Sequence, residues 1–95
     1  MYTYILIYDN ETADREAMKS HLNSLPEILS WRFDIPNSCF IYSTETASRL
    51  TELLSSRLSN YKCFLFVEMP SNKQGYLKRE TWNFINQTAF NDRQS

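Results

Sequence analysis

The stretch Tyr-Thr-Tyr-Ile-Leu-Ile-Tyr at residues 2–8 decides the fold. Its residues are β-branched, aromatic and almost continuously apolar, which is typical of a strand that is covered on both faces. The run stops abruptly at Asp9, where Asn10 and Glu11 follow. The stretch therefore predicts a central strand of a sheet, ending at an acidic residue.

A helix pattern follows this strand. Apolar residues recur at spacings of three and four from Ala17 to Leu25, as on one face of a helix. Thr12 or Asp14 can cap its start, and Pro26 disfavours its continuation.

Residues 29–34 alternate as a half-buried strand does, and residues 39–43 are apolar again. The Ile-Pro-Asn-Ser turn signal at residues 35–38 predicts that these two strands form an antiparallel hairpin. A second helix follows, with Thr44 or Thr46 as its cap. Its apolar stripe comprises Ala47, Leu50, Leu53, Leu54 and Leu58.

With a fourth strand at residues 61–68, the element order is β-α-β-β-α-β, a ferredoxin-like split βαβ arrangement. Right-handed crossovers then place two helices on one face of a four-stranded antiparallel sheet, so the predicted class is α+β. A short C-terminal strand at residues 75–77 and a helix at residues 78–86 follow. We expect a single ferredoxin-like domain at residues 1–86 and a polar tail at residues 87–95.

Composition narrows the classes of function. The 95 residues are 42% apolar, which indicates one globular domain. Ten Lys and Arg against eleven Asp and Glu give a net charge of −1, so charge alone does not indicate strong nucleic-acid binding. No run of about 18 apolar residues exists and the N-terminus resembles a strand, so we expect a cytoplasmic protein with no membrane partner. The single Gly excludes P-loop and dinucleotide-binding fingerprints.

The cysteines and the lone histidine do not form a recognisable catalytic or metal motif. Cys39 and Cys63 lie inside apolar runs without metal-ligand spacing, so we expect two buried, reduced thiols, with a disulfide as the alternative. His21 lies on or beside the apolar stripe of the first helix and is predicted to be half-buried and structural. The sequence shows neither a nucleophile partner for this one His, as a Ser-His-Asp or Cys-His enzyme needs, nor enough ligands for a zinc site.

Asp9 is the first candidate for chemistry. It stands where a central strand leaves the sheet, a suitable place for a divalent-metal ligand or a general base. The alternative is a structural turn residue, because Asp favours turns. Mg²⁺ usually takes one or two carboxylates together with water and phosphate, so two copies of Asp9 in a two-fold dimer would suit it. Other carboxylates that could contribute are Glu11, Asp14 and Glu68.

One basic cluster contains Lys73, Lys78 and Arg79, with Tyr76 and Trp82 interleaved. A cation beside an aromatic ring is what contact with a phosphate and a base requires. A solvated helix face with its aromatic rings packed beneath the sheet is the alternative.

Two helix starts offer further contacts. Arg15 follows Asp14, and both an internal ion pair and a ligand contact remain open for it. Residues 43–46, Ser-Thr-Glu-Thr, resemble a phosphate-binding helix start, which ordinary capping explains equally well.

The six Tyr, six Phe and two Trp exceed what so small a core readily hides. Neither face of the first strand is charged. We therefore expect the helix-free face of the sheet to be covered by the C-terminal segment, by a second subunit, or by both. The aromatic residues assigned to a dimer interface are Tyr2, Tyr4, Tyr76 and Trp82.

The segment from Tyr4 to Asp9 resembles the first strand of the small CRISPR-associated integration and nuclease proteins, the second member of the Cas set. The pair Asp14-Arg15 is similar to the start of their first helix. Their superfamily includes the virulence-associated protein D toxins. A closer similarity, to small proteins called SinR-like, covers most of the chain and is carried by Ser30-Trp31 and by residues 38–42, 44–54 and 75–85.

The resemblance implies a ferredoxin-like homodimer in which Asp9 matches the family aspartate that lies at the dimer cleft and binds metal in nuclease members. The chain is less basic than many nucleic-acid binders of the family. The Arg-rich stretch after the first strand is reduced here to Arg15.

Three functional hypotheses result. The first is an endonuclease or toxin that depends on Mg²⁺ or Mn²⁺ and acts on RNA or DNA through paired Asp9 carboxylates. The residues that would contact the nucleic-acid backbone are Arg15, Lys73, Lys78 and Arg79. The second is a non-catalytic homodimeric scaffold for nucleic acid or for a protein partner encoded by a neighbouring gene. The third is a small-ligand regulatory domain.

Overall fold

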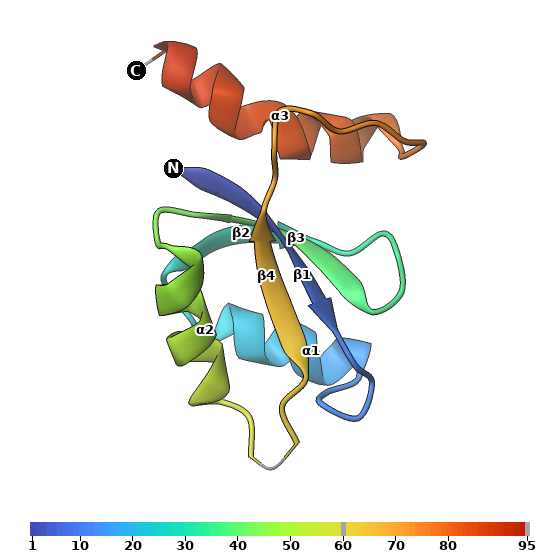
Figure 1. Cartoon of the computed structure of the whole chain (residues 1–95), viewed down its shortest axis with the longest axis vertical. Coiled ribbons are helices and arrows are strands. Elements are labelled where there is room, and N and C mark those ends of the chain that lie inside the picture. Colours follow the sequence, from blue (N-terminus) through green and yellow to red (C-terminus); the bar gives the residue numbers. More distant parts are fainter. Residues whose placement is uncertain (60, 95) are drawn as a thin grey trace.

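The computed structural model describes residues 1–59 and 61–94, with side chains in the last helix described as far as Asn86. The strands are β1 (Tyr2–Tyr8), β2 (Ile28–Arg32), β3 (Ser38–Ser43) and β4 (Phe64–Glu68). The helices are α1 (Arg15–Asn23), α2 (Ala47–Ser55) and α3 (Arg79–Gln94). The predicted α+β class and the four-stranded antiparallel sheet are confirmed (Figure 1).

The strands lie in the order β2-β3-β1-β4, so β1 is a central strand as predicted. Leu6 of β1 lies opposite Cys39 of β3 on one side and Phe66 of β4 on the other. Because side chains alternate along a strand, Leu6 shares one face of the sheet with Tyr4 and Tyr8, and the intervening residues of β1 face the other way.

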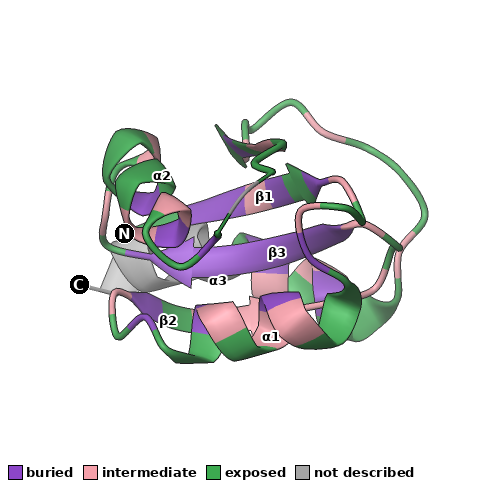
Figure 2. Cartoon of the chain, turned by 90° about the horizontal axis from the view of Figure 1, so that it is seen from below, coloured by how far each residue is buried: buried purple, intermediate pink, exposed green. Residues whose placement is uncertain are grey.

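The main core lies between the first of these faces and the helices α1 and α2. Figure 2 shows both helices on the near side of the sheet, with buried residues turned toward it. Asp14 caps α1 by accepting the amide of Ala17 at 2.8 Å, and Thr46 caps α2 by accepting the amide of Arg49 at 3.1 Å. Buried side chains of this core include Tyr4, Leu6, Met18, Leu22, Ile41, Leu50, Leu54 and Phe66.

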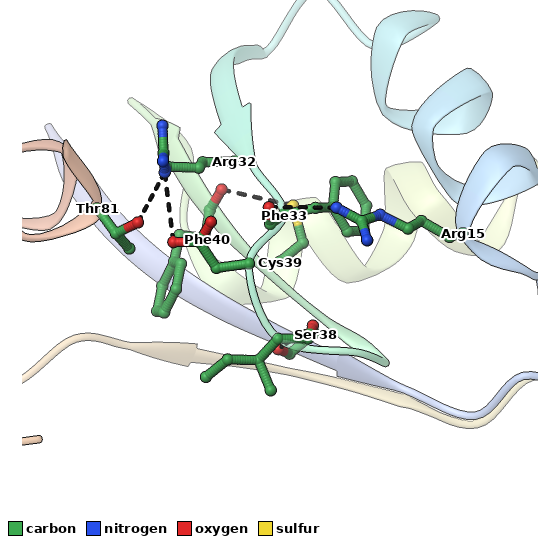
Figure 3. A network of polar contacts seen from close by, with 9 residues as sticks. Arg15, Arg32, Phe33, Ser38, Cys39, Phe40 and Thr81 are labelled. Atoms are coloured by element: carbon green, nitrogen blue, oxygen red, sulfur yellow. Dashed lines mark hydrogen bonds and ion pairs between the residues drawn. The ribbon is translucent and has the colours of Figure 1, made fainter. Parts of the chain in front are cut away.

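Helix α3 lies on the opposite side of the sheet, behind it in Figure 2. Arg32 of β2 donates from Nε to Oγ1 of Thr81 at 2.7 Å, which ties α3 to the sheet (Figure 3). Thr81 and Ile85 of α3 are buried, as is Phe40 of β3. The C-terminal segment therefore covers part of this face.

The C-terminal region differs from the prediction. Residues 75–77 form no strand, and Tyr76 is fully exposed, so the segment lacks the burial that stabilises a strand. Helix α3 begins at Arg79 and runs through the region predicted as a tail, since no Pro or Gly follows Gly75. None of the helices within the described residues is long and apolar enough to cross a membrane.

Candidate functional site

Asp9 lies directly after β1 and is held by a tight turn. Its backbone amide donates to the Cys63 carbonyl at 3.1 Å, and its own carbonyl accepts the Thr12 amide at 2.9 Å. The carboxylate is half-buried, and its Oδ1 accepts the Glu11 amide at 3.4 Å. The sheet therefore fixes the backbone of Asp9 while the side chain stays accessible.

Cys63, which precedes β4, lies beside Asp9 because β4 pairs with β1. Thr12 links the two segments, since the Cys63 amide donates to Thr12 Oγ1 at 2.9 Å. Cys63 is exposed, which corrects the prediction of two buried thiols. The apolar run that suggested burial begins at this residue, but the ordered strand starts only at Phe64. Cys39 is buried as predicted, and both thiols are free.

The hydroxyl of Tyr61 completes this cluster. The pKa of Tyr61 is raised to about 12. The causes, largest first, are hydrogen bonding to Cys63, electrostatic interaction with Cys63 and hydrogen bonding to Asp9. A shallow cavity of about 370 Å³ opens beside the cluster. Its lining residues are Ile7, Tyr8, Asp9, Cys63, Phe64 and Leu65. Asp9 therefore lies at the rim of a hollow whose walls are largely apolar.

Arg15, predicted to contact a phosphate or Asp14, is directed toward the end of β2 (Figure 3). Its guanidinium lies 5.2 Å from the centroid of the Phe33 ring and donates to the Phe33 carbonyl at 3.2 Å. Asp14 instead caps α1. The structure thus gives Arg15 a packing role against Phe33.

The basic cluster lies on the connector between β4 and α3 and on the first turn of α3. Lys73 donates from Nζ to the Pro70 carbonyl at 3.0 Å, and Lys78 and Arg79 are exposed. Trp82, one turn further along α3, is half-buried. The structure therefore brings Trp82 and Lys73 to the same cavities, one of about 430 Å³ and one of about 260 Å³.

The four aromatic residues assigned to a dimer interface occupy different environments. Tyr4 is only 2% exposed and donates from its hydroxyl to the Glu45 carbonyl at 2.6 Å, so it packs in the core of the protomer. Tyr2 and Tyr76 are exposed. The dimer interface proposed below contains none of these four residues: Tyr4 is buried in the protomer, and Tyr76 and Trp82 line cavities beside α3.

The remaining candidates, His21 and residues 43–46, lie in ordinary helix-end environments. His21 is half-buried in the last turn of α1. In residues 43–46, Ser43 accepts the Glu45 amide at 3.0 Å and Thr46 caps α2. Ordinary capping accounts for this helix start.

The sequence predicted an uncharged helix-free face, but not which apolar side chains beside Asp9 the C-terminal segment would leave uncovered. Ile7 is 47% exposed, and it lies opposite Leu65, which is 57% exposed. Ile5, which is half-buried, lies opposite Val67 in the same ladder, and Val67 is 38% exposed. We call Ile5, Ile7, Leu65 and Val67 the β1–β4 patch. Residues 64–67 are continuously apolar, so their pattern does not indicate which face of the strand is exposed.

The chain was also compared with protein-family models, with curated proteins and with solved structures. None of the three comparisons finds a match. The candidate sites therefore rest on the residues and geometry described above.

Proposed function

We propose that this protein is a homodimer of ferredoxin-like protomers that associates with nucleic acid and cleaves it with a divalent metal ion bound by paired Asp9 carboxylates. The observation that carries this proposal is the position of Asp9 at the edge of the exposed β1–β4 patch. The resemblance of the segment from Tyr4 to Asp9 to CRISPR-associated nuclease proteins supports the same function.

The sheet order supports the ferredoxin-like assignment. A split βαβ unit places the third strand between the first two, and β3 lies between β1 and β2 here. The fourth strand joins the free edge of β1. Side chains of α1 and α2 share a single core cluster with strand residues, as two helices on one face would.

The β1–β4 patch supports the homodimer. Contiguous exposed apolar side chains on a sheet face mark an interaction surface. A two-fold axis applies the same patch to itself, so a second copy is an occupant of matching chemistry. Because Asp9 and Leu65 line one cavity, such a contact brings the two Asp9 side chains toward the same interface.

The donor set at Asp9 fits a hard cation such as Mg²⁺ or Mn²⁺ only as part of a pair. Among the described residues, no group of three His, Cys, Asp or Glu side chains is placed to hold a metal. Mg²⁺ accepts one or two carboxylates and fills its remaining positions with water and phosphate oxygens. Two Asp9 carboxylates would meet that need, and the bound ion would supply charge neutralisation at phosphate and an activated water.

The direct test is cleavage of labelled RNA and DNA by the purified protein with Mg²⁺, with Mn²⁺ and with EDTA. Asp9→Asn keeps the shape of the side chain and removes its charge, so we expect cleavage to be lost. Glu52→Gln is the matched control, since it neutralises an exposed carboxylate of α2 that has no proposed part in the metal site. Equal cleavage by Asp9→Asn and the wild-type protein would sink the catalytic proposal.

The dimer is tested separately by size-exclusion chromatography with light scattering. We expect Leu65→Asp to give a monomer, because it places a charge in the patch. Leu29→Asp alters a side chain of similar exposure on β2, at the other edge of the sheet, and should leave the dimer intact. A wild-type monomer at high concentration would contradict the proposal.

A non-catalytic homodimeric scaffold is the second candidate, and the β1–β4 patch favours it independently of Asp9. This function predicts a dimer that binds RNA, DNA or a protein partner without metal-dependent cleavage. Metal-dependent cleavage therefore separates the two candidates, since the nuclease alone requires it.

A further inference from the structure

Two adjoining cavities lie between the connector that follows β4 and helix α3. One, of about 260 Å³, has mainly apolar walls, and the other, of about 430 Å³, has mainly polar walls. The residues that line both are Lys73, Gln74, Gly75 and Trp82. We call the pair of cavities the connector groove. It combines a hydrophobic compartment with a polar one, as small-ligand sites commonly do.

The apolar compartment offers a place for a planar ring. Phe40 and Ile85, both buried, contribute to its wall, and the half-buried Trp82 borders both compartments. Tyr76 also lines this compartment, yet its side chain is fully exposed. An aromatic ring held out in solvent at a cavity mouth is available for stacking.

The charge of the connector reverses that of the whole chain. Residues 69–79 contain Lys73, Lys78 and Arg79 and no Asp or Glu, whereas the chain carries a net charge of −1. Within the described residues, the three ion pairs involve none of these cations. The Lys73 ammonium has three N–H donors and uses one of them on the Pro70 carbonyl. The cations of this segment therefore suit an anionic ligand.

We propose that the connector groove binds a nucleotide unit of single-stranded nucleic acid, with its base against Trp82 and Tyr76 and its phosphate beside Lys73. Lys78 and Arg79 contact the adjacent phosphates. Stacking on protein rings requires an unstacked base, so a single strand fits and a duplex does not. This inference deepens the nucleic-acid association proposed above and rests on it, but it does not require cleavage at Asp9.

The test uses the fluorescence of Trp82. Trp31→Phe leaves Trp82 as the only tryptophan, and its emission is titrated with uridine 5′-monophosphate and with a short oligouridine. Anisotropy of the labelled oligouridine with the unmodified protein measures the same affinity without that substitution. We expect saturable quenching by the oligouridine. Quenching by the mononucleotide as well identifies a free nucleotide as a ligand of the same groove.

Substitutions in the groove separate stacking from charge. Tyr76→Leu should weaken oligouridine binding about 5- to 150-fold, whereas Tyr76→Phe keeps the ring and preserves the affinity. Lys73→Gln should reduce the slope of log affinity against log salt by about 0.7. Arg49→Gln is the matched control, because it removes an exposed cation from α2.

Failure of this inference can be told apart from failure of the proposed function. If the oligouridine binds but neither groove substitution differs from Arg49→Gln, the groove is not the binding site and the inference is overturned. If neither probe binds at all, the inference is overturned, while the cleavage assay with RNA and DNA decides the proposed function separately. If binding depends on the groove but no cleavage occurs, the inference stands and the nuclease is rejected.

Discussion

Nε of Arg32 and Oγ1 of Thr81 are 2.7 Å apart, and this hydrogen bond joins β2 to α3 across 49 positions of sequence. Thr81 is fully buried, and Arg32 also forms an ion pair with Asp34 at 3.4 Å. The guanidinium thus lies between its own hairpin and the C-terminal helix (Figure 3). This contact ties α3, which lines the connector groove, to the sheet.

Thr81→Val should therefore destabilise the protein. Valine fills the same space but cannot accept the hydrogen bond of Arg32, so we expect the free energy of unfolding to fall by about 1–3 kcal/mol. Urea denaturation monitored by circular dichroism measures the change. Thr44→Val, at an exposed position, is the control and should stay within about 0.5 kcal/mol of the wild-type protein. A loss no larger than that of the control would show that this contact does not hold α3.

The parts of the fold that the sequence predicts are those set by local patterns. The apolar run of residues 2–8 and the 3.6-residue periodicity of both early helices each specify one element without reference to the rest of the chain. The prediction of a strand at residues 75–77 is wrong because aromatic and apolar residue types alone do not supply a partner strand. Tyr76 instead ends up fully exposed.

The candidate site was predictable only in part, for a physical reason. Asp9 could be identified because it ends a strand, a local feature. Its neighbours Cys63 and Tyr61 are more than fifty positions away, and the pairing of β1 with β4 brings them to it. Which side chains of β1 and β4 stay exposed likewise depends on where α3 covers the sheet, and a continuous apolar run does not specify this.

Leu54→Ala and Leu65→Ala should have opposite consequences for stability and association. Leu54 of α2 is fully buried in the core, so its truncation should cost about 2–5 kcal/mol of unfolding free energy. Leu65 is 57% exposed, so its truncation should leave the protomer stability within about 0.5 kcal/mol. Denaturation of dilute protein measures both values, and light scattering then shows whether Leu65→Ala weakens the dimer. A large loss of protomer stability in Leu65→Ala would mean that the patch is part of the core.

The two thiols should react at different rates. Cys63 is exposed, whereas burial raises the pKa of Cys39 to about 12 and keeps that thiol neutral and shielded. A chromogenic disulfide reagent at neutral pH should therefore modify one thiol rapidly in the folded protein and the second only after denaturant is added. Cys63→Ser should abolish the rapid phase, and Cys39→Ala the slow one. Rapid modification of both thiols in the native protein would contradict this assignment.

Alkaline pH should destabilise the fold partly through Cys39. Its pKa is raised from 9.0 to about 12 in the folded protein, chiefly by burial, so its contribution to stability is complete below pH 9. Between the two values the unfolded thiol releases its proton while the folded one keeps it, and stability falls by up to about 1.4 kcal/mol per pH unit. Burial also raises the pKa of Tyr4 and Tyr8, which adds a loss of the same sign at high pH.

Denaturation in the presence of a reductant at several values above pH 8 isolates the part that belongs to Cys39. Cys39→Ala should be less stable than the wild-type protein at pH 8, and the difference should shrink as pH rises because the variant has no thiol to ionise. Leu54→Ala is the control: it removes buried volume but no ionisable group, so its deficit should stay constant over the same range. If the deficit of Cys39→Ala also stays constant, ionisation of this thiol is not what weakens the fold at alkaline pH.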